Sequence, residues 1–319
     1  MLDLSLVIPV YNEAESLPEL AAGIEAVCAE AGLTYEVWLV DDGSSDSSWE
    51  VIEALHAQDP RFMGVRFRRN YGKSAALAVG FEQARGRYVI TMDADLQDDP
   101  AEIPLLIGHL EEGEYDLVSG WKQKRHDPLG KTIPSRFFNA ITRGFSGIPL
   151  HDFNCGLKIY RREVVKSVRV YGELHRYIPL LAKWEGYERI GEKVVQHHAR
   201  KYGHTKFGLE RYIRGFLDLM TVLFLTRFAA RPMHFFGTMG TLSFLGGFVI
   251  SLWLSYDKIF NGSPLSDRPL LLLGAILLVI GVQLFLVGFL GEMVIRPRME
   301  QTSTYHIREV TAATRRAEV

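Results

Sequence analysis

Two carboxylates stand at alternate positions where an apolar stretch of the chain ends near residue 92. Asp93, Ala94 and Asp95 follow this stretch, and Gln97 comes two residues later. In an extended chain, residues two positions apart point to the same side, so Asp93 and Asp95 would face one space. Carboxylate and amide oxygens suit Mg²⁺ or Mn²⁺, ions that also bridge substrate phosphates. The pattern favours metal-assisted chemistry on a phosphorylated substrate, although a single pair of this kind is more often a helix cap or a turn.

Acidic residues also follow two earlier apolar runs. Glu13 comes shortly after the run 4–10, and Asp41 and Asp42 come after the run 36–40. Such runs alternate with helical patterns, which predicts an α/β domain with a mostly parallel sheet and helices on both faces. Ligands bind beyond the carboxyl ends of the strands in such a sheet. We therefore expect the three acidic segments to line one site.

The elements that must position this site can be given as residue ranges. The expected strands cover residues 4–10, 36–40, 63–67, 87–92 and 116–119, and the expected helices cover 14–31, 45–58, 74–85 and 101–112. The glycine patterns of dinucleotide-binding and P-loop folds are absent. A net charge of −2 does not favour nucleic-acid binding. The two cysteines, Cys28 and Cys155, predict neither a disulfide framework nor a zinc site, and no signal peptide is expected.

Two uncharged apolar segments, residues 235–254 and 270–290, follow this domain. Each would span about 30 Å as a helix, the thickness of a bilayer core, so two transmembrane helices are predicted rather than a buried hairpin of a soluble core. Arginines flank the pair on both outer sides, so both ends are expected in the cytosol at the inner (cytoplasmic) membrane. Gly274, Gly281 and Gly288 would form a stripe for close helix packing, either within the hairpin or in a homo-oligomer.

Four motifs in order resemble those of the family 2 inverting glycosyltransferases of GT-A fold. They are Val7-Ile8-Pro9-Val10-Tyr11-Asn12-Glu13, Asp41-Asp42-Gly43-Ser44, Asn70-Tyr71-Gly72-Lys73 and Asp93-Ala94-Asp95-Leu96-Gln97-Asp98-Asp99-Pro100. Within that family the chain resembles the polyprenyl-phosphate glycosyltransferases, the group that includes dolichyl-phosphate mannose synthase and bacterial undecaprenyl-phosphate glucosyltransferases. The resemblance implies a GT-A (Rossmann-like) catalytic domain, then amphipathic interfacial helices and two transmembrane helices.

The resemblance also implies roles for residues of the site. The residues that would bind the nucleotide-sugar are Pro9, Tyr11, Glu13, Asp42, Lys73, Asp93, Ala94, Arg200 and Lys206. Asp95 and Gln97 would hold Mg²⁺ or Mn²⁺, and Asp95, Asp152 and Arg200 would act in catalysis. His197 and His198 lie near Arg200, but as adjacent residues without a third ligand they do not predict a zinc site.

Four polar residues precede or begin an expected amphipathic helix: Lys122, Lys131, Ser135 and Arg136. The apolar side of this helix could belong to the protein core or to the membrane interface, and in the second interpretation the four residues would bind the acceptor phosphate. The expected organisation is a catalytic domain over 1–207, an amphipathic helix over 208–232, a transmembrane hairpin over 233–295 and a cytosolic tail over 296–319.

A phosphate acceptor would explain why no catalytic base stands out. A polyprenyl phosphate is already an oxyanion at neutral pH, so no proton must be removed before it attacks the sugar. The resemblance implies an inverting transfer of a hexose, and the likeness to the bacterial members favours UDP-glucose as the donor, with UDP-sugars preferred over GDP-sugars. A processive polysaccharide synthase is the first alternative, but the chain has no Q-x-x-R-W motif. A non-catalytic membrane scaffold is the second, although Asp93, Asp95, Gln97 and Arg200 are all present.

Overall fold

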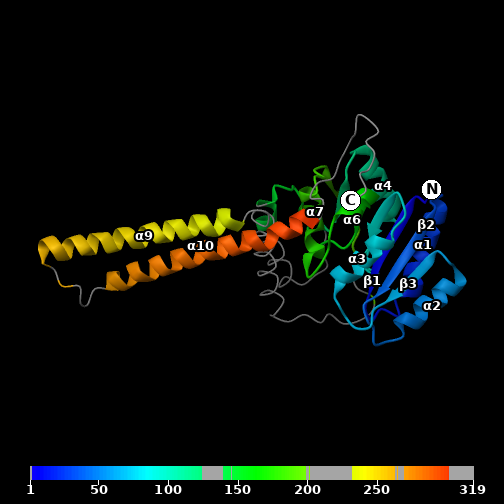
Figure 1. The fold of residues 1–319 in the computed structure, drawn as a ribbon. Coiled ribbons are helices and arrows are strands. Elements are labelled where there is room, and N and C mark those ends of the chain that lie inside the picture. The colour runs from blue at the N-terminus through cyan, green and yellow to red at the C-terminus, as the bar shows by residue number, and fades with distance from the viewer. Residues whose placement is uncertain are drawn as a thin grey trace. The chain divides into compact units, whose positions relative to one another are not determined.

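The structure is a computed structural model of the chain, and it describes residues 2–123, 139–144, 146–198, 201, 232–262, 264 and 269–301. The chain divides into two compact units, Met1–Val222 and Leu223–Val319. Figure 1 shows a sheet flanked by helices in the first unit and a pair of long helices in the second.

The first unit is built on a seven-stranded sheet with the strand order β3-β2-β1-β4-β6-β5-β7. The strands are β1 (Leu4–Val10), β2 (Tyr35–Asp41), β3 (Phe62–Arg66), β4 (Tyr88–Thr91), β5 (Leu117–Trp121), β6 (Lys158–Arg161) and β7 (Ile190–Val194). All neighbouring pairs are parallel except those of β6, which runs antiparallel to both β4 and β5. The expected α/β class and mostly parallel sheet are confirmed.

Helices connect the strands and cover the sheet. They are α1 (Leu17–Glu30), α2 (Ser48–Gln58), α3 (Lys73–Gln83), α4 (Glu102–Glu112), α6 (Arg162–Ser167), η1 (Leu174–Tyr177) and α7 (Ile178–Trp184). Successive residues of β1 pack against different helices, so helices cover both faces of the sheet. Leu6 and Ile8 share a buried cluster with Ile24 of α1, whereas Val7 lies against Gly80 of α3. Because neighbouring strand residues point to opposite faces, α1 and α3 cover opposite faces of the sheet.

Two helices begin later than the sequence patterns suggest. The expected starts were residues 14 and 45, and the observed starts are Leu17 and Ser48. The residues before each start are held in loops by side-chain hydrogen bonds, such as that from the Glu13 backbone N–H to Ser48 Oγ at 2.9 Å. Serine and asparagine side chains compete with helical backbone bonding in this way, so the loops after β1 and β2 extend further into the sequence.

The antiparallel strand β6 brings a distant segment to the carboxyl ends of the parallel strands. Its first residue, Lys158, pairs with Thr91 at the end of β4 and with Ser119 in β5. A parallel strand at this position would start from the opposite edge of the sheet. The segment from Asp152 to Leu157 therefore enters the sheet beside the residues that follow β4.

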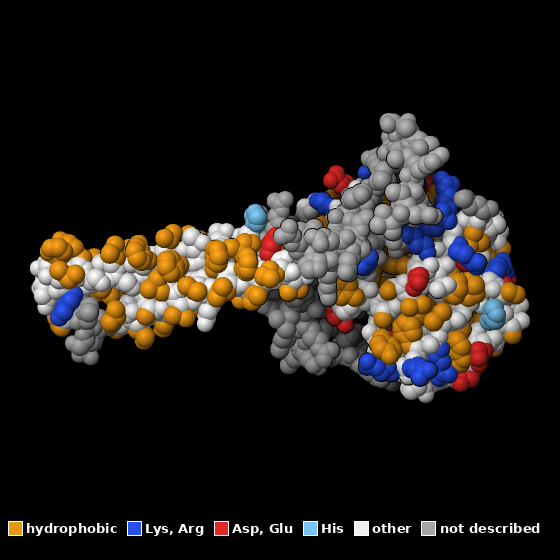
Figure 2. Space-filling view, in the orientation of Figure 1, with side chains coloured by type: hydrophobic (Ala, Val, Ile, Leu, Met, Phe, Trp, Pro, Cys, Tyr) orange, Lys and Arg blue, Asp and Glu red, His pale blue; other side chains and the backbone are white. Residues whose placement is uncertain are grey.

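The second unit is a helical hairpin of α9 (Pro232–Asn261) and α10 (Pro269–Gln301). Both helices are long and apolar enough to cross a membrane, and only 17% and 11% of their most apolar windows are buried. Figure 2 shows hydrophobic side chains over the surface of this hairpin. Core helices of a soluble protein bury such residues, so the exposure agrees with two membrane-spanning helices.

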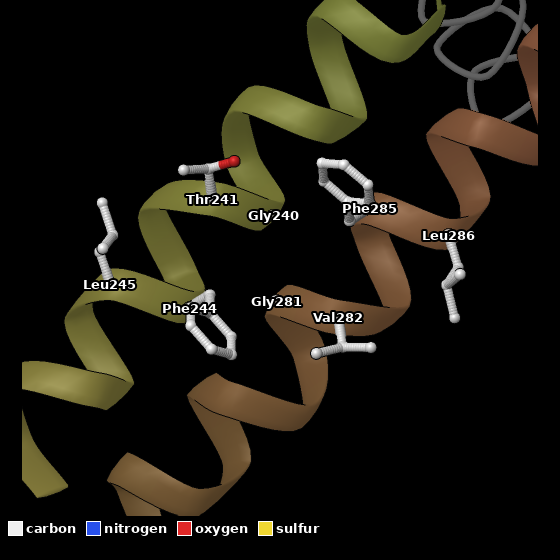
Figure 3. Close-up of a pocket in the computed structure, with 8 residues that line it drawn as sticks. All are labelled: Gly240, Thr241, Phe244, Leu245, Gly281, Val282, Phe285 and Leu286. Carbon is white, nitrogen blue, oxygen red and sulfur yellow. The ribbon is translucent and has the colours of Figure 1, made fainter.

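Glycines allow the two helices of the hairpin to approach closely. A Cβ atom on Gly281 would lie 2.6 Å from the Phe244 backbone nitrogen and 2.8 Å from the Gly240 carbonyl oxygen, and Gly274 lies similarly beside Gly247. Figure 3 shows Gly240 opposite Gly281, with Phe244 and Phe285 turned into the space between the helices. The glycine stripe of α10 thus serves packing within the hairpin, which was one of the two expectations.

Candidate active site

The loops after β1 and β2 are joined to each other by hydrogen bonds. The Asn12 backbone N–H donates to Ser44 Oγ at 2.9 Å, and Asn12 Oδ1 accepts the Ser45 backbone N–H at 2.8 Å. Asn12 has a φ of 57°, a left-handed conformation that asparagine tolerates better than most residues. This turn leaves Tyr11 about half exposed at the carboxyl edge of the sheet. The two loops therefore form one surface, as expected for a shared site.

Asp42 fixes the loop that carries Lys73. Its two carboxylate oxygens accept the backbone N–H groups of Tyr71 at 2.6 Å and Gly72 at 2.9 Å. Asp42 is buried, and burial raises the pKa of its carboxyl group even though these two hydrogen bonds act in the opposite direction. Gly43 is required beside it, because its φ is 71° and a Cβ would lie 2.5 Å from the Arg69 carbonyl carbon. The expected contact of Asp42 with the nucleotide stays a prediction.

Lys73 forms an ion pair with Asp93, which links the third motif to the fourth. Burial alone would raise the pKa of Asp93, but the positive charges of Lys73, Lys122 and Lys158 lower it to about 2. Lys122 itself lies in an ion pair with buried Asp98, at 2.8 Å from Nζ to Oδ1. Asp93 is therefore ionised at neutral pH and surrounded by three cations.

The segment before β6 packs directly against Asp93. Thr91 Oγ1 donates a hydrogen bond to the Gly156 carbonyl oxygen at 2.8 Å. A Cβ atom on Gly156 would lie 2.5 Å from Asp93 Oδ2, which is closer than real Cβ atoms come to other atoms. Lys158 is buried two residues later and donates to the Cys155 carbonyl oxygen. Gly156 is thus a position where a side chain would displace the Asp93 carboxylate.

Asp152 is held at the same edge by Glu192 of β7. One Glu192 oxygen accepts the backbone N–H groups of His151 at 2.6 Å and Asp152 at 3.0 Å, and the other lies 2.7 Å from His151 Nδ1. The His151 ring also stacks on Trp121 at the end of β5, with centroids 4.2 Å apart. Glu192 was not among the residues expected from the sequence. The pattern of apolar and polar residues in β7 does not indicate that the Glu192 side chain binds a loop and does not face solvent.

Asp95 and Gln97 lie in a tight turn after β4. The Gln97 backbone N–H donates to Asp95 Oδ1 at 3.2 Å, and Leu96 between them has a φ of 60°. A bulky residue in the left-handed region is strained, and such strain is concentrated at functional sites. The same turn pairs with His198, whose backbone N–H donates to the Gln97 carbonyl oxygen at 2.9 Å. The turn thereby lies beside the segment that precedes Arg200.

The side chains of this turn fit a divalent metal ion by their chemistry. Asp95 supplies a carboxylate and Gln97 an amide oxygen, and both residues are partly exposed. Over the described ranges, no group of three or more histidine, cysteine, aspartate or glutamate side chains is placed to hold a metal. A metal ion here would take its other ligands from substrate oxygens and water, as Mg²⁺ and Mn²⁺ do at phosphate-binding sites.

A histidine that sequence reasoning missed lies next to Lys73. His175 of η1 contacts Ser74, the residue after Lys73, through its backbone N–H at 3.1 Å and its ring Nδ1 at 3.0 Å. Burial, together with the charges of Lys73 and Arg176, lowers the pKa of His175 to about 2. No motif pointed to it, because the contact joins residues that are about 100 positions apart.

Several expected site residues lie outside the residues that the structure describes. They are Lys131, Ser135, Arg136, Arg200 and Lys206, and the expected amphipathic helix before the hairpin lies there as well. Among the described residues, the structure brings together the loops that carry Tyr11, Asp42, Lys73, Asp93 and Asp152 at one edge of the sheet. The roles of all these residues remain predictions.

The chain is similar to known proteins in both sequence and fold. Residues 5–169 match the model for glycosyl transferase family 2. A dodecaprenyl-phosphate galacturonate synthase from Rhizobium johnstonii is 39% identical over 97% of this chain and 93% of its own length. An undecaprenyl-phosphate 4-deoxy-4-formamido-L-arabinose transferase from Pseudomonas aeruginosa is 38% identical over 90% of this chain and 84% of its own.

Solved structures agree on the fold. The mannosyl-3-phosphoglycerate synthase from Rubrobacter xylanophilus gives a TM-score of 0.57 at 17% identity, over 70% of this chain and 74% of its own. The glucosyl-3-phosphoglycerate synthase from Mycobacterium tuberculosis, solved with Mn²⁺ and UDP, gives 0.53 at 20% identity, over 70% and 79%. These likenesses support the GT-A fold expected from the motifs. With its four motifs gathered at one edge of the sheet, the chain belongs to glycosyl transferase family 2.

Proposed function

We propose that this glycosyltransferase moves a sugar from a nucleotide-sugar to a polyprenyl phosphate at the cytosolic face of the inner membrane. Both relatives named above act on polyprenyl phosphates according to their names, and their matches cover 97% and 90% of this chain. The two exposed apolar helices support a membrane location, which a lipid acceptor requires. The expected product is a polyprenyl-phosphate-linked sugar for the cell envelope.

The observation that carries this proposal is the charge arrangement around Asp93. A carboxylate with a strongly lowered pKa lies among Lys73, Lys122 and Lys158, next to the Asp95–Gln97 turn. Asp93 can accept hydrogen bonds from ribose hydroxyls, and Asp95 and Gln97 would hold Mg²⁺ or Mn²⁺. The metal ion, when bound, would offset the negative charge that develops on the departing nucleoside diphosphate.

The acceptor phosphate explains the rest of the site. One of its oxygens bonds to the anomeric carbon while the bond from that carbon to the nucleoside diphosphate breaks. Attack from the face opposite the leaving group inverts the anomeric configuration. The chain's own residues have to position two anions and exclude water, which cationic side chains do without a catalytic base. Arg200 and Lys206 on the donor, and Lys122, Lys131, Ser135 and Arg136 on the acceptor, keep the roles predicted for them. Lys122 also pairs with Asp98.

The donor sugar is the finer part of the proposal. The resemblance to bacterial glucosyltransferases favours UDP-glucose, whereas the relatives are named for galacturonate and 4-deoxy-4-formamido-L-arabinose. These sugars differ from glucose in the substituents of the ring, so a panel of donors separates them. We propose a UDP-linked donor and include all three sugars, with GDP-mannose as the contrast.

The proposal is tested by transfer of radiolabel from this donor panel to undecaprenyl phosphate in detergent with Mn²⁺. Label should pass to the lipid phase from one UDP-sugar, and the Asp95→Ala variant should lose this transfer. The matched control is Asp59→Ala, since Asp59 lies after α2, where its carboxylate bonds Arg61. Products longer than one sugar would favour a processive synthase. Folded, UDP-binding enzyme that transfers no sugar to the lipid would contradict the proposal.

A further inference from the structure

His175 is tied to the Lys73–Asp93 ion pair through Ser74. Ser74 is buried in the first turn of α3, directly after Lys73, and both contacts from His175 converge on its hydroxyl oxygen. The charges of Lys73, Lys158 and Asp93 all act on the imidazole ring, which places it beside the described site. His175 therefore lies beside the Lys73–Asp93 ion pair although it has no role in the expected chemistry.

The hydrogen bonds of Ser74 favour one tautomer of the His175 ring. The Ser74 oxygen accepts the His175 backbone N–H at 3.1 Å. Among the described residues, the only acceptor within reach of the Ser74 hydroxyl proton is His175 Nδ1, at 3.0 Å. A serine hydroxyl can donate one hydrogen bond, and we infer that Nδ1 accepts it, which puts the proton of the neutral ring on Nε2. Glu173 Oε2 lies farther from Nδ1, at 4.0 Å.

The Nε2–H group is available to a ligand. The side chain of His175 is 15% exposed, and no described residue hydrogen-bonds to Nε2. Burial and the neighbouring cations keep the ring neutral, so Nε2–H is an uncharged donor among charged side chains. Phosphate oxygens are better matched by the lysines around Asp93, whereas a neutral N–H suits a neutral hydroxyl oxygen.

We propose that His175 Nε2–H donates a hydrogen bond to a ring hydroxyl of the donor's sugar, which makes His175 a residue that determines donor specificity. This inference rests on the proposed function, because it assumes that a nucleotide-sugar binds at Asp93. Ser74 is the positioning residue, since its hydroxyl selects the tautomer that presents a proton to the sugar. In this proposal His175 binds the sugar, whereas the lysines around Asp93 and the metal ion held by the Asp95–Gln97 turn would bind the diphosphate.

Two substitutions of similar size distinguish this contact from a structural role. In His175→Gln, the side-chain amide nitrogen can take the place of Nε2, whereas in His175→Asn the amide can bond Ser74 but is too short to reach the sugar. Ser74→Ala removes the hydroxyl that selects the tautomer. We expect His175→Asn to weaken binding of the nucleotide-sugar by about tenfold, as for one lost hydrogen bond, and His175→Gln to recover most of it.

Calorimetry in detergent with Mn²⁺ would compare UDP with UDP-glucose and UDP-galacturonate for wild type and the three variants. For His175→Asn and Ser74→Ala, the expected result is a loss confined to UDP-sugars, with unchanged affinity for UDP. Monodeoxy analogues of the sugar that wild type binds would each lack one ring hydroxyl. The analogue that lacks the hydroxyl contacted by His175 should bind wild type and His175→Asn equally. An equal loss for UDP and UDP-sugar, or no loss in either, would overturn the inference. Sugar-specific binding without transfer to lipid would instead refute only the proposed function.

Discussion

Asp93 draws its charge environment from three separate parts of the chain. Lys73 begins α3, Lys122 follows β5 and Lys158 begins β6, and each lowers the pKa of the Asp93 carboxyl. An acid whose pKa is lowered on folding stabilises the folded state above its ordinary pKa of 3.8, and this contribution is lost as the pH falls through about 2. The ion pair therefore stabilises the folded state at neutral pH and keeps Asp93 ionised, which is the protonation state that a bound nucleotide would contact.

The substitution Lys73→Met should remove the charge that, of the three, lowers the pKa of Asp93 most. The pKa of Asp93 should then rise, since burial opposes ionisation and less positive charge offsets it. We expect a lower melting temperature than wild type at neutral pH, with the difference shrinking as the pH falls from about 4 to about 2. Thermal unfolding in detergent at several pH values measures this.

Asp93→Asn supplies the control for that measurement. In this background Lys73→Met has no carboxylate to affect, so the pH-dependent part of its effect should disappear. A difference in melting temperature between Lys73→Met and wild type that stays constant across the acid range would contradict the ion-pair explanation.

The residues found from the sequence share one property, which is that they follow a strand within a motif. Asp42 and Asp93 could be predicted because each lies in a short polar segment directly after an apolar run, and Lys73 because its motif resembles one of the family. His175 and Glu192 could not, since their importance arises from contacts with Ser74 and Asp152 far along the chain. Local patterns contain no information on such pairings, which tertiary packing alone determines.

At the scale of elements, the approach of β6 to β4 depends on the absence of a side chain at Gly156. A Cβ at this position would lie 2.5 Å from Asp93 Oδ2. We expect Gly156→Ala to move the Asp93 carboxylate and to lower transfer activity by about 100-fold, because small displacements of positioning groups have large effects on rate. The measurement is the turnover number in the lipid-transfer assay.

Gly108→Ala is a matched control for Gly156→Ala. Gly108 lies within α4, and a Cβ there would have no atom within 4 Å. Alanine within a helix is favoured over glycine by roughly 0.5–1 kcal/mol, so this variant should be slightly more stable and fully active. Equal activity losses in the two variants would show that the contact with Asp93 is not the cause.

The hairpin offers a second test of close packing. Gly281→Ala would place a Cβ 2.6 Å from the Phe244 backbone nitrogen and force α9 and α10 apart. We expect destabilisation of about 1–3 kcal/mol, as for overpacked interiors. Gly246→Ala, on α9 with no atom within 4 Å of its Cβ, should have no such effect. Unfolding of the two variants in detergent measures the difference, and similar stabilities would contradict this packing.

The sequence predicts some helices and strands better than others. The first five strands and four helices follow from hydrophobic periodicity, and their observed limits differ by a few residues. β6 was not expected as an antiparallel strand, since four residues, Lys158–Arg161, give too short a pattern to show a direction. The pairing partners of a strand depend on the whole sheet, so only the structure shows that this one lies between β4 and β5.

At the scale of the whole molecule, the proposed orientation can be tested with cysteine labelling. The natural cysteines should not react, because Cys28 and Cys155 are buried and burial raises their pKa values to about 11 and about 12. Single cysteines can then report each side of the membrane. Asn261→Cys lies at the end of α9, and Glu30→Cys lies on the catalytic domain, both exposed.

A membrane-impermeant maleimide applied to intact bacterial cells that express the protein should label Asn261→Cys. Glu30→Cys should be labelled only after the membrane is opened. The positive-inside distribution of arginines is the reason for this expectation. The reverse pattern of labelling would contradict the cytosolic placement of the catalytic domain.

The position of β6 has a consequence for the order in which the protein folds. During synthesis, β4 and β5 leave the ribosome well before β6, yet β6 lies between them and hydrogen-bonds to both. Until residue 161 has emerged, β4 presents an unpaired edge, and such edges invite association with other chains. Closing the sheet also requires long-range contacts, which form slowly. The site around Asp93 therefore cannot be complete until β6 has been made and paired, so β4 has an unpaired edge during part of synthesis.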